Sequence, residues 1–150
     1  MIEELEPTND HRYDDRYSVA YSVYGKALDP DGLVAAHPPG RQYELWHAGD
    51  VRGGTRRSVT SGIRIDLVEA AMPADAAKAI EAFVIAEKAF LQAAARCVQD
   101  EGWSAITCAM FVYAKVPSTM SLPATLLSLL GESGVEWAVT GYPCADDDGP

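Results

Sequence analysis

The chain has 150 residues, of which 48% are hydrophobic and 23% are charged, and its formal net charge is −10 at pH 7. This length suits one globular domain that needs no disulfide or metal to fold, and the composition excludes disorder of the whole chain. A strongly anionic protein is repelled by nucleic acid and by anionic lipid, so we expect neither as a partner and consider a basic protein instead. The alternative is that the acidity only keeps the protein soluble.

The two ends of the chain set the expected limits of the domain. Residues 1–15 have few apolar side chains and no signal or transit pattern, and residues 143–150 include three consecutive aspartates. Neither segment can bury enough apolar surface to offset the entropy of ordering it. Both are therefore predicted to be disordered tails around a single domain at residues 16–142.

The first half of the domain is predicted to hold three strands and one short helix. Tyrosine and valine alternate from residue 17 to 24, which predicts a strand. An Asp-Pro pair then begins a short helix that runs to about Ala36. Residues 43–47 are a short strand candidate, and residues 48–58 are a glycine- and arginine-rich loop. Residues 62–67 alternate cleanly between apolar and charged side chains, which predicts another strand.

The clearest expected element is one long helix from Pro73 to about Glu101, closed by Gly102. Its alanine-rich composition favours a helix, and proline fits the first turn. At ~100° per residue the apolar side chains gather on one stripe, which predicts a core-facing side. The stripe consists of Ile80, Phe83, Val84, Phe90, Leu91, Ala94 and Val98.

The rest of the chain supplies two more strands and a helix. Residues 104–114 are apolar on both faces, which is typical of a strand in mid-sheet or under helices. Ser121 is expected to cap a short leucine-rich helix that Gly131 stops, and Gly134 leads into a last strand. The order β-α-β-β-α-β, then α-β, predicts an α+β fold with a ferredoxin-like core and a C-terminal αβ extension. We expect its sheet to be mostly antiparallel, with the helices on one face.

Neither the cysteines nor the histidines form a recognisable catalytic or metal-binding motif. Cys97, Cys108 and Cys144 lie far apart, and the first two sit in apolar stretches as expected core residues. The three histidines lack metal-ligand spacing, and no serine or cysteine lies in a nucleophile elbow. We therefore expect a non-enzyme without a metal or cofactor. Cytoplasmic residence is expected because the thiols are unpaired and no apolar run is long enough to span a membrane.

The glycine- and arginine-rich loop is the first candidate binding site. Its Arg52, Arg56 and Arg57 could grip an anion while glycine amides approach it, and Asp50 lies in the same loop. The alternative is a mobile, solvated connection between two strands. Trp46, just before the loop, is the aromatic residue that we expect to be exposed and to contact a partner.

Glu87 is the second candidate, because it lies at the centre of the apolar stripe. A buried carboxylate must be paired or protonated. One hypothesis makes it a polar anchor in a pocket. The alternatives are an ion pair with an arginine, such as Arg64, or a position at a hydrated edge of the stripe.

Several short segments occur in the order in which one known family has them. They are Tyr17-Ser18-Val19 with Gly25, Leu28-Asp29-Pro30-Asp31, Trp46 with Gly49-Asp50, Thr60-Ser61-Gly62, Ser121-Leu122-Pro123 and the strand after Gly134. Through them the chain resembles, over about residues 16–142, a bacterial family catalogued as domain of unknown function 4279. The chain departs from the family after the first helix, where only His37-Pro38-Pro39-Gly40 replaces a longer segment. The resemblance implies a stand-alone bacterial cytoplasmic protein and brings no established activity or catalytic residues.

Two hypotheses of function from different classes follow. The first is a non-catalytic protein-binding module, specifically an immunity protein that neutralises a basic toxin, because opposite charges steer such partners together. The second is a small-ligand or anion-binding regulatory domain that uses the arginines of the loop. The sequence predicts no oligomeric state.

Overall fold

The computed structural model describes residues 16–112 and 119–144, and within these ranges the chain forms five strands and four helices. In chain order they are β1 (Arg16–Gly25), α1 (Pro30–Ala36), β2 (Glu44–Trp46), β3 (Ser61–Ala70), α2 (Pro73–Ala86), α3 (Lys88–Cys97), β4 (Trp103–Val112), α4 (Ala124–Glu132) and β5 (Glu136–Pro143). The predicted α+β class is confirmed.

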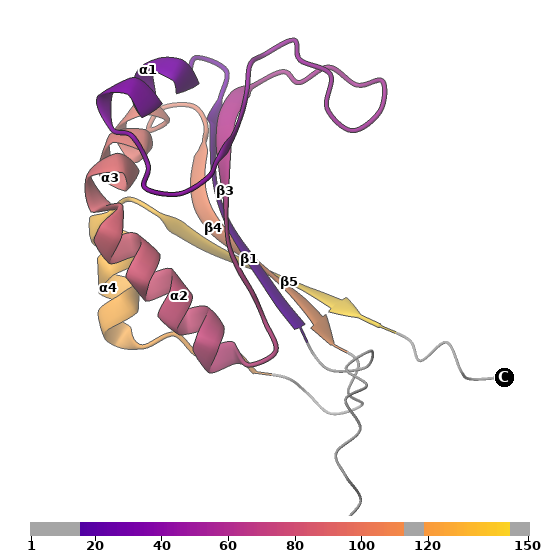
Figure 1. The fold of residues 1–150 in the computed structure, drawn as a ribbon, viewed down its shortest axis with the longest axis vertical. Coiled ribbons are helices and arrows are strands. Elements are labelled where there is room, and N and C mark those ends of the chain that lie inside the picture. The colour runs from indigo at the N-terminus through magenta and orange to yellow at the C-terminus, as the bar shows by residue number, and fades with distance from the viewer. Residues whose placement is uncertain (1–15, 113–118, 145–150) are drawn as a thin grey trace, which may run out of the picture.

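All five strands join one sheet in the order β2-β3-β1-β4-β5. Neighbouring strands are antiparallel, except that β5 runs parallel to β4. A parallel neighbour requires a crossover connection, and α4 lies in that connection here. Figure 1 shows the helices gathered on one face of the sheet, so the core lies between that face and the helix layer.

The core forms where alternate side chains of the central strands meet the helices. The Tyr21 ring of β1 lies 5.7 Å from the Phe83 ring and 6.0 Å from the Phe90 ring, measured between centroids. Ile65 of β3 and Ile106 of β4 are the register partners of Tyr21 on either side. All five side chains are buried, as is every other residue of the predicted apolar stripe. The stripe is therefore confirmed as core.

The prediction of one continuous helix from Pro73 to Glu101 is wrong, because the chain breaks at Glu87. This residue has φ −111° and ψ 22° between the end of α2 and the start of α3. The first of these helices contacts β3 and the second contacts β4. Because a sheet twists, two short helices can follow its surface where one straight helix would diverge from it. The helical segment also ends early, at Cys97, which is exposed rather than part of the core.

Two other elements differ from their predicted limits. The third strand continues to Ala70 through an irregularity at Leu67, where its register with β1 shifts by one residue. The last helix begins after Pro123, which occupies the cap position that Ser121 was expected to fill. No side chain caps this end, and Gly131 lies inside the last turn of α4 rather than beyond it. Ser121 and Gly131 therefore predict the two ends of α4 only to within a few positions.

The described structure continues past residue 142, where the sequence predicts the domain to end. β5 includes Pro143, and the Cys144 amide donates a hydrogen bond of 2.8 Å to the Val112 carbonyl. The predicted tails otherwise lie outside the described residues, as do the last two residues of the strand predicted to end at residue 114.

Candidate functional site

The glycine- and arginine-rich segment forms a small hairpin between β2 and β3, defined here as residues 47–58. The Ser58 amide donates to the Asp50 carbonyl at 2.7 Å, and nearer the tip the Arg52 amide donates to the Arg56 carbonyl at 3.2 Å. Figure 1 shows this segment as a purple loop that projects from the end of the sheet. The internal pairing means that it is not a structureless connection.

Glycine allows the sharp changes of direction in this hairpin. Gly49, Gly53 and Gly54 have φ values of 95°, 60° and 103°. Side chains with a Cβ rarely adopt this left-handed region, whereas glycine enters it at little cost. The turns themselves therefore account for these glycines, and their presence does not by itself indicate a phosphate site.

Trp46 corrects the expectation of an exposed aromatic residue, since only 6% of it is exposed. One side of its indole rests against Gly62, where the Cβ of any other residue would collide with the ring. The Arg52 guanidinium covers the ring, with its carbon 3.7 Å from the ring centroid. The indole Nε1 is buried and has no hydrogen-bond partner among the described residues. Hairpin and strand together thus enclose this tryptophan.

The three arginines of the hairpin do not converge on one point. Arg52 lies over the Trp46 ring and also pairs with Glu44, with 3.8 Å between Nη2 and Oε1. Arg57 donates from Nη1 to the Gly49 carbonyl at 2.9 Å. The Arg56 guanidinium is exposed and makes no hydrogen bond or ion pair within the described ranges. Two of the three guanidinium groups are therefore engaged inside the protein.

His47 is a site residue that the sequence reasoning missed. Its Nε2 hydrogen-bonds the Asp31 carboxylate of α1, and its backbone amide donates to Asp50 Oδ2 at 2.8 Å. The hydrogen bond to Asp31, with the negative charges of Asp31, Asp50 and Asp29, raises the pKa of His47 above its ordinary 6.5, although desolvation opposes this. The three-residue spacing to Asp50 is a visible signal, but only the fold brings Asp31 close.

Glu87 has a structural partner that neither hypothesis named. Its Oε1 accepts a hydrogen bond of 2.8 Å from the Gly40 amide, in the segment that follows α1. Arg64, the suggested ion-pair partner, instead donates from Nε to Asp66 Oδ1 at 3.0 Å. Glu87 is 9% exposed and lies in the helix layer, apart from the hairpin. It ties the connection after α1 to the junction between two helices.

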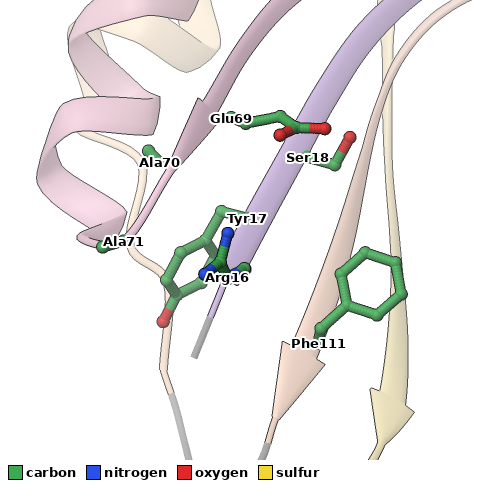
Figure 2. Close-up of a pocket in the computed structure, with 7 residues that line it drawn as sticks. All are labelled: Arg16, Tyr17, Ser18, Glu69, Ala70, Ala71 and Phe111. Carbon is green, nitrogen blue, oxygen red and sulfur yellow. The ribbon is translucent and has the colours of Figure 1, made fainter. Parts of the chain in front are cut away.

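A separate pocket of about 370 Å³ opens at the end of the sheet where β1 begins. Figure 2 shows Arg16 and Tyr17 at this end of β1, with Phe111 on β4 across from them and Glu69 on β3 above. None of the sequence-predicted site residues lines this pocket. The polar residues that line it are Arg16, Tyr17, Ser18 and Glu69.

No group of three or more His, Cys, Asp or Glu side chains in residues 16–112 and 119–144 is placed to hold a metal ion. None of the helices in those ranges has the length and apolar character needed to cross a membrane.

Comparison of the chain with models of protein families, with curated proteins and with solved structures found no match.

Proposed function

We propose that this chain is a non-catalytic protein-binding module and, more specifically, an immunity protein that neutralises a basic toxin. The observation that carries the proposal is the outward placement of its negative charge. Among the described residues every Asp and Glu except Glu87 is exposed. The ten described Lys and Arg are exposed as well, so the described surface holds twelve exposed carboxylates against ten cations. The net charge of −10, of which −8 lies in residues 1–15 and 145–150, attracts a basic partner and repels nucleic acid.

The charge is also unevenly distributed along the chain. Residues 1–15 and 145–150 hold nine of the 22 acidic side chains and one of the 12 basic ones. Residues 41–64 instead carry five basic and two acidic side chains. On this proposal the attraction to a basic partner comes from the protein outside that basic segment, and the hairpin arginines contribute nothing to it.

The kinetics of binding to a co-purified partner test this proposal. Salt screens charges beyond a Debye length of about 10 Å at 0.1 M, so association should slow clearly between low and moderate salt while dissociation changes less. Reversing three charges at once, by Arg52→Glu, Arg56→Glu and Arg57→Glu, should leave binding intact. Binding that is insensitive to salt and is lost with the arginines would contradict the electrostatic argument.

The second candidate is an anion-binding regulatory domain that uses the same hairpin. The exposed Arg56 guanidinium, without a partner in the described ranges, favours it, as does the open space around Gly53 and Gly54. On this hypothesis phosphate or a nucleotide raises the melting temperature, and the triple charge reversal removes the effect. No stabilisation by millimolar phosphate, pyrophosphate or ATP would reject it.

The proposal also includes the fold topology, the family and the cellular compartment of the chain. We infer a ferredoxin-like core extended by α4 and β5, supported by the order of β4, β1, β3 and β2 with antiparallel neighbours. Membership of the bacterial family catalogued as domain of unknown function 4279 stays a prediction. Cytoplasmic residence is supported by the three free cysteines.

A further inference from the structure

One arginine of this protein occupies a site whose chemistry suits arginine recognition in general. The Trp46 indole rests against Gly62 and carries the Arg52 guanidinium, whose carbon lies 3.7 Å from the ring centroid. The Glu44 carboxylate lies 3.8 Å from the same guanidinium. A flat aromatic surface beside a carboxylate is the combination that attracts a planar, charged guanidinium group.

The parts of this site differ in how firmly they are held. Trp46 is fixed, because it is buried against β3 and forms part of the ladder between β2 and β3. Glu44 belongs to the same short strand, and 66% of its side chain is exposed. Arg52 comes from the projecting hairpin, and 38% of its side chain is exposed. Trp46 and Glu44, which form the site, are thus part of the sheet, whereas Arg52, which fills it, is a surface side chain of the hairpin.

We infer that the Trp46 ring face covered by Arg52 and the Glu44 carboxylate form a binding site for an arginine side chain of a partner protein, which Arg52 occupies in the free protein. This rests on the proposed function, because a basic partner supplies such arginines. Arg52 acts as an internal competitor that the partner displaces. Removal of Arg52 therefore strengthens arginine binding, which a purely structural role of the residue does not predict.

How strongly Arg52 competes with a free arginine depends on its covalent attachment beside the site. A side chain held on a short connection competes at an effective concentration on the order of millimolar or more. A free arginine derivative that binds in the same range is then weakened several-fold in the intact chain. The site favours arginine over lysine, because the planar guanidinium stacks on the ring whereas the ammonium is a compact, strongly hydrated charge.

The test is a titration with N-acetyl-arginine amide, followed through the Trp46 indole N–H by NMR and assigned by its loss in Trp46→Phe. We expect a saturable shift in Arg52→Ala, with a Kd at least about threefold lower than in the wild type. Arg56→Ala is the matched control, because it removes one charge from the same hairpin without uncovering Trp46. It should behave as the wild type does. N-acetyl-lysine amide should shift the signal less.

The double variant Arg52→Ala with Glu44→Gln identifies the carboxylate, and it should lose the saturable shift. The inference is overturned if Arg52→Ala shows no saturable shift, or if both variants respond equally. If Arg52→Ala loses the pairing of Val51 with Arg57, Arg52→Gln replaces it and the same outcomes decide. These titrations need no partner protein. A failed arginine site therefore leaves the proposed protein-binding role standing, and a failed partner search leaves the arginine site standing.

Discussion

At Gly62, the absence of a side chain lets the Trp46 indole lie directly against β3. A Cβ there would collide with the ring and approach the Val23 carbonyl oxygen at 2.7 Å. The absence of a side chain at Gly62 is therefore what allows Trp46 to be buried.

The first prediction concerns this contact. Gly62→Ala should displace Trp46 and lower the free energy of unfolding by roughly 1–3 kcal/mol, the usual cost of overpacking. The change should also weaken the stacking of Arg52 and alter tryptophan fluorescence. Gly141→Ala is the matched control on β5, where nothing lies within 4 Å of an added Cβ. Equal stability of the two variants in urea denaturation would show that the Trp46 contact is not close-packed.

The second prediction at this scale concerns His47. Because Asp31 raises the pKa of this histidine, the protonated form is favoured in the folded state, and its contribution to stability is present below the ordinary value of 6.5. That contribution is lost as pH rises through the folded-state pKa. Asp31→Asn should lower the pKa of His47 and destabilise the protein only on the acidic side of that range.

NMR titration of the His47 ring measures this pKa, and thermal melts at pH 5.5 and 8.5 measure the stability. Asp75→Asn is the matched control, because it removes a carboxylate from the first turn of another helix, away from His47. An unchanged pKa of His47 in Asp31→Asn would refute the assigned hydrogen bond.

Among the elements, the junction between α2 and α3 depends on one carboxylate. Glu87 accepts a hydrogen bond from the Gly40 amide across 47 residues of chain. It thereby connects the segment after α1 to the helix layer. Gly40 is exposed, so its amide can bond water when the acceptor is lost, and the stabilisation comes from the hydrogen bond itself, which is typically worth about 1 kcal/mol and more when the acceptor is charged.

The third prediction therefore concerns Glu87→Ala, which should lower the free energy of unfolding by roughly 1–3 kcal/mol and speed hydrogen exchange at the Gly40 amide. Glu87→Gln keeps an acceptor oxygen and should cost less. Glu81→Ala, an exposed position on α2, should change stability by no more than about 0.5 kcal/mol. Equal changes in the free energy of unfolding for Glu87→Ala and Glu81→Ala would show that the bond to Gly40 does not stabilise the protein.

The sequence was sufficient for features that depend on local periodicity. The alternation in β1 and the stripe through Phe83 and Phe90 located the core, because burial imposes those patterns directly. It was insufficient where the outcome depends on residues distant in sequence. Glu87, at the break, bonds Gly40 47 residues earlier in the chain, and Trp46 is covered by Gly62 and Arg52.

The same distinction applies to the candidate site. The hairpin residues were named from composition, which predicted basic groups and glycines in one place. Composition could not show that Arg52 and Arg57 are engaged within the protein, or that Asp31 joins His47. Those contacts arise from the pairing of β2 with β3 and from the position of α1, which only the fold determines.

For the whole molecule, the described residues expose twelve carboxylates and ten Lys or Arg side chains, three of them on the 47–58 hairpin, and residues 1–15 and 145–150 add nine acidic residues. On the proposed function, this net negative charge gives a long-range attraction to a basic protein. On the further inference, the Glu44 and Trp46 pair gives a local contact for an arginine once Arg52 moves away. The two effects act at different ranges, so the first governs the rate of association and the second governs retention.

The most direct test is affinity capture with the immobilised chain from lysate of the organism that encodes it, followed by quantitative mass spectrometry. Three baits are compared: the wild type, the triple variant with Arg52, Arg56 and Arg57 changed to Glu, and a variant with Asp75, Glu81 and Glu132 changed to amides. We predict that the first two baits retain the same basic protein, that the third retains less of it, and that salt elutes it. Capture of no basic protein, or of one that is lost with the arginines and unaffected by loss of the carboxylates, would contradict the account.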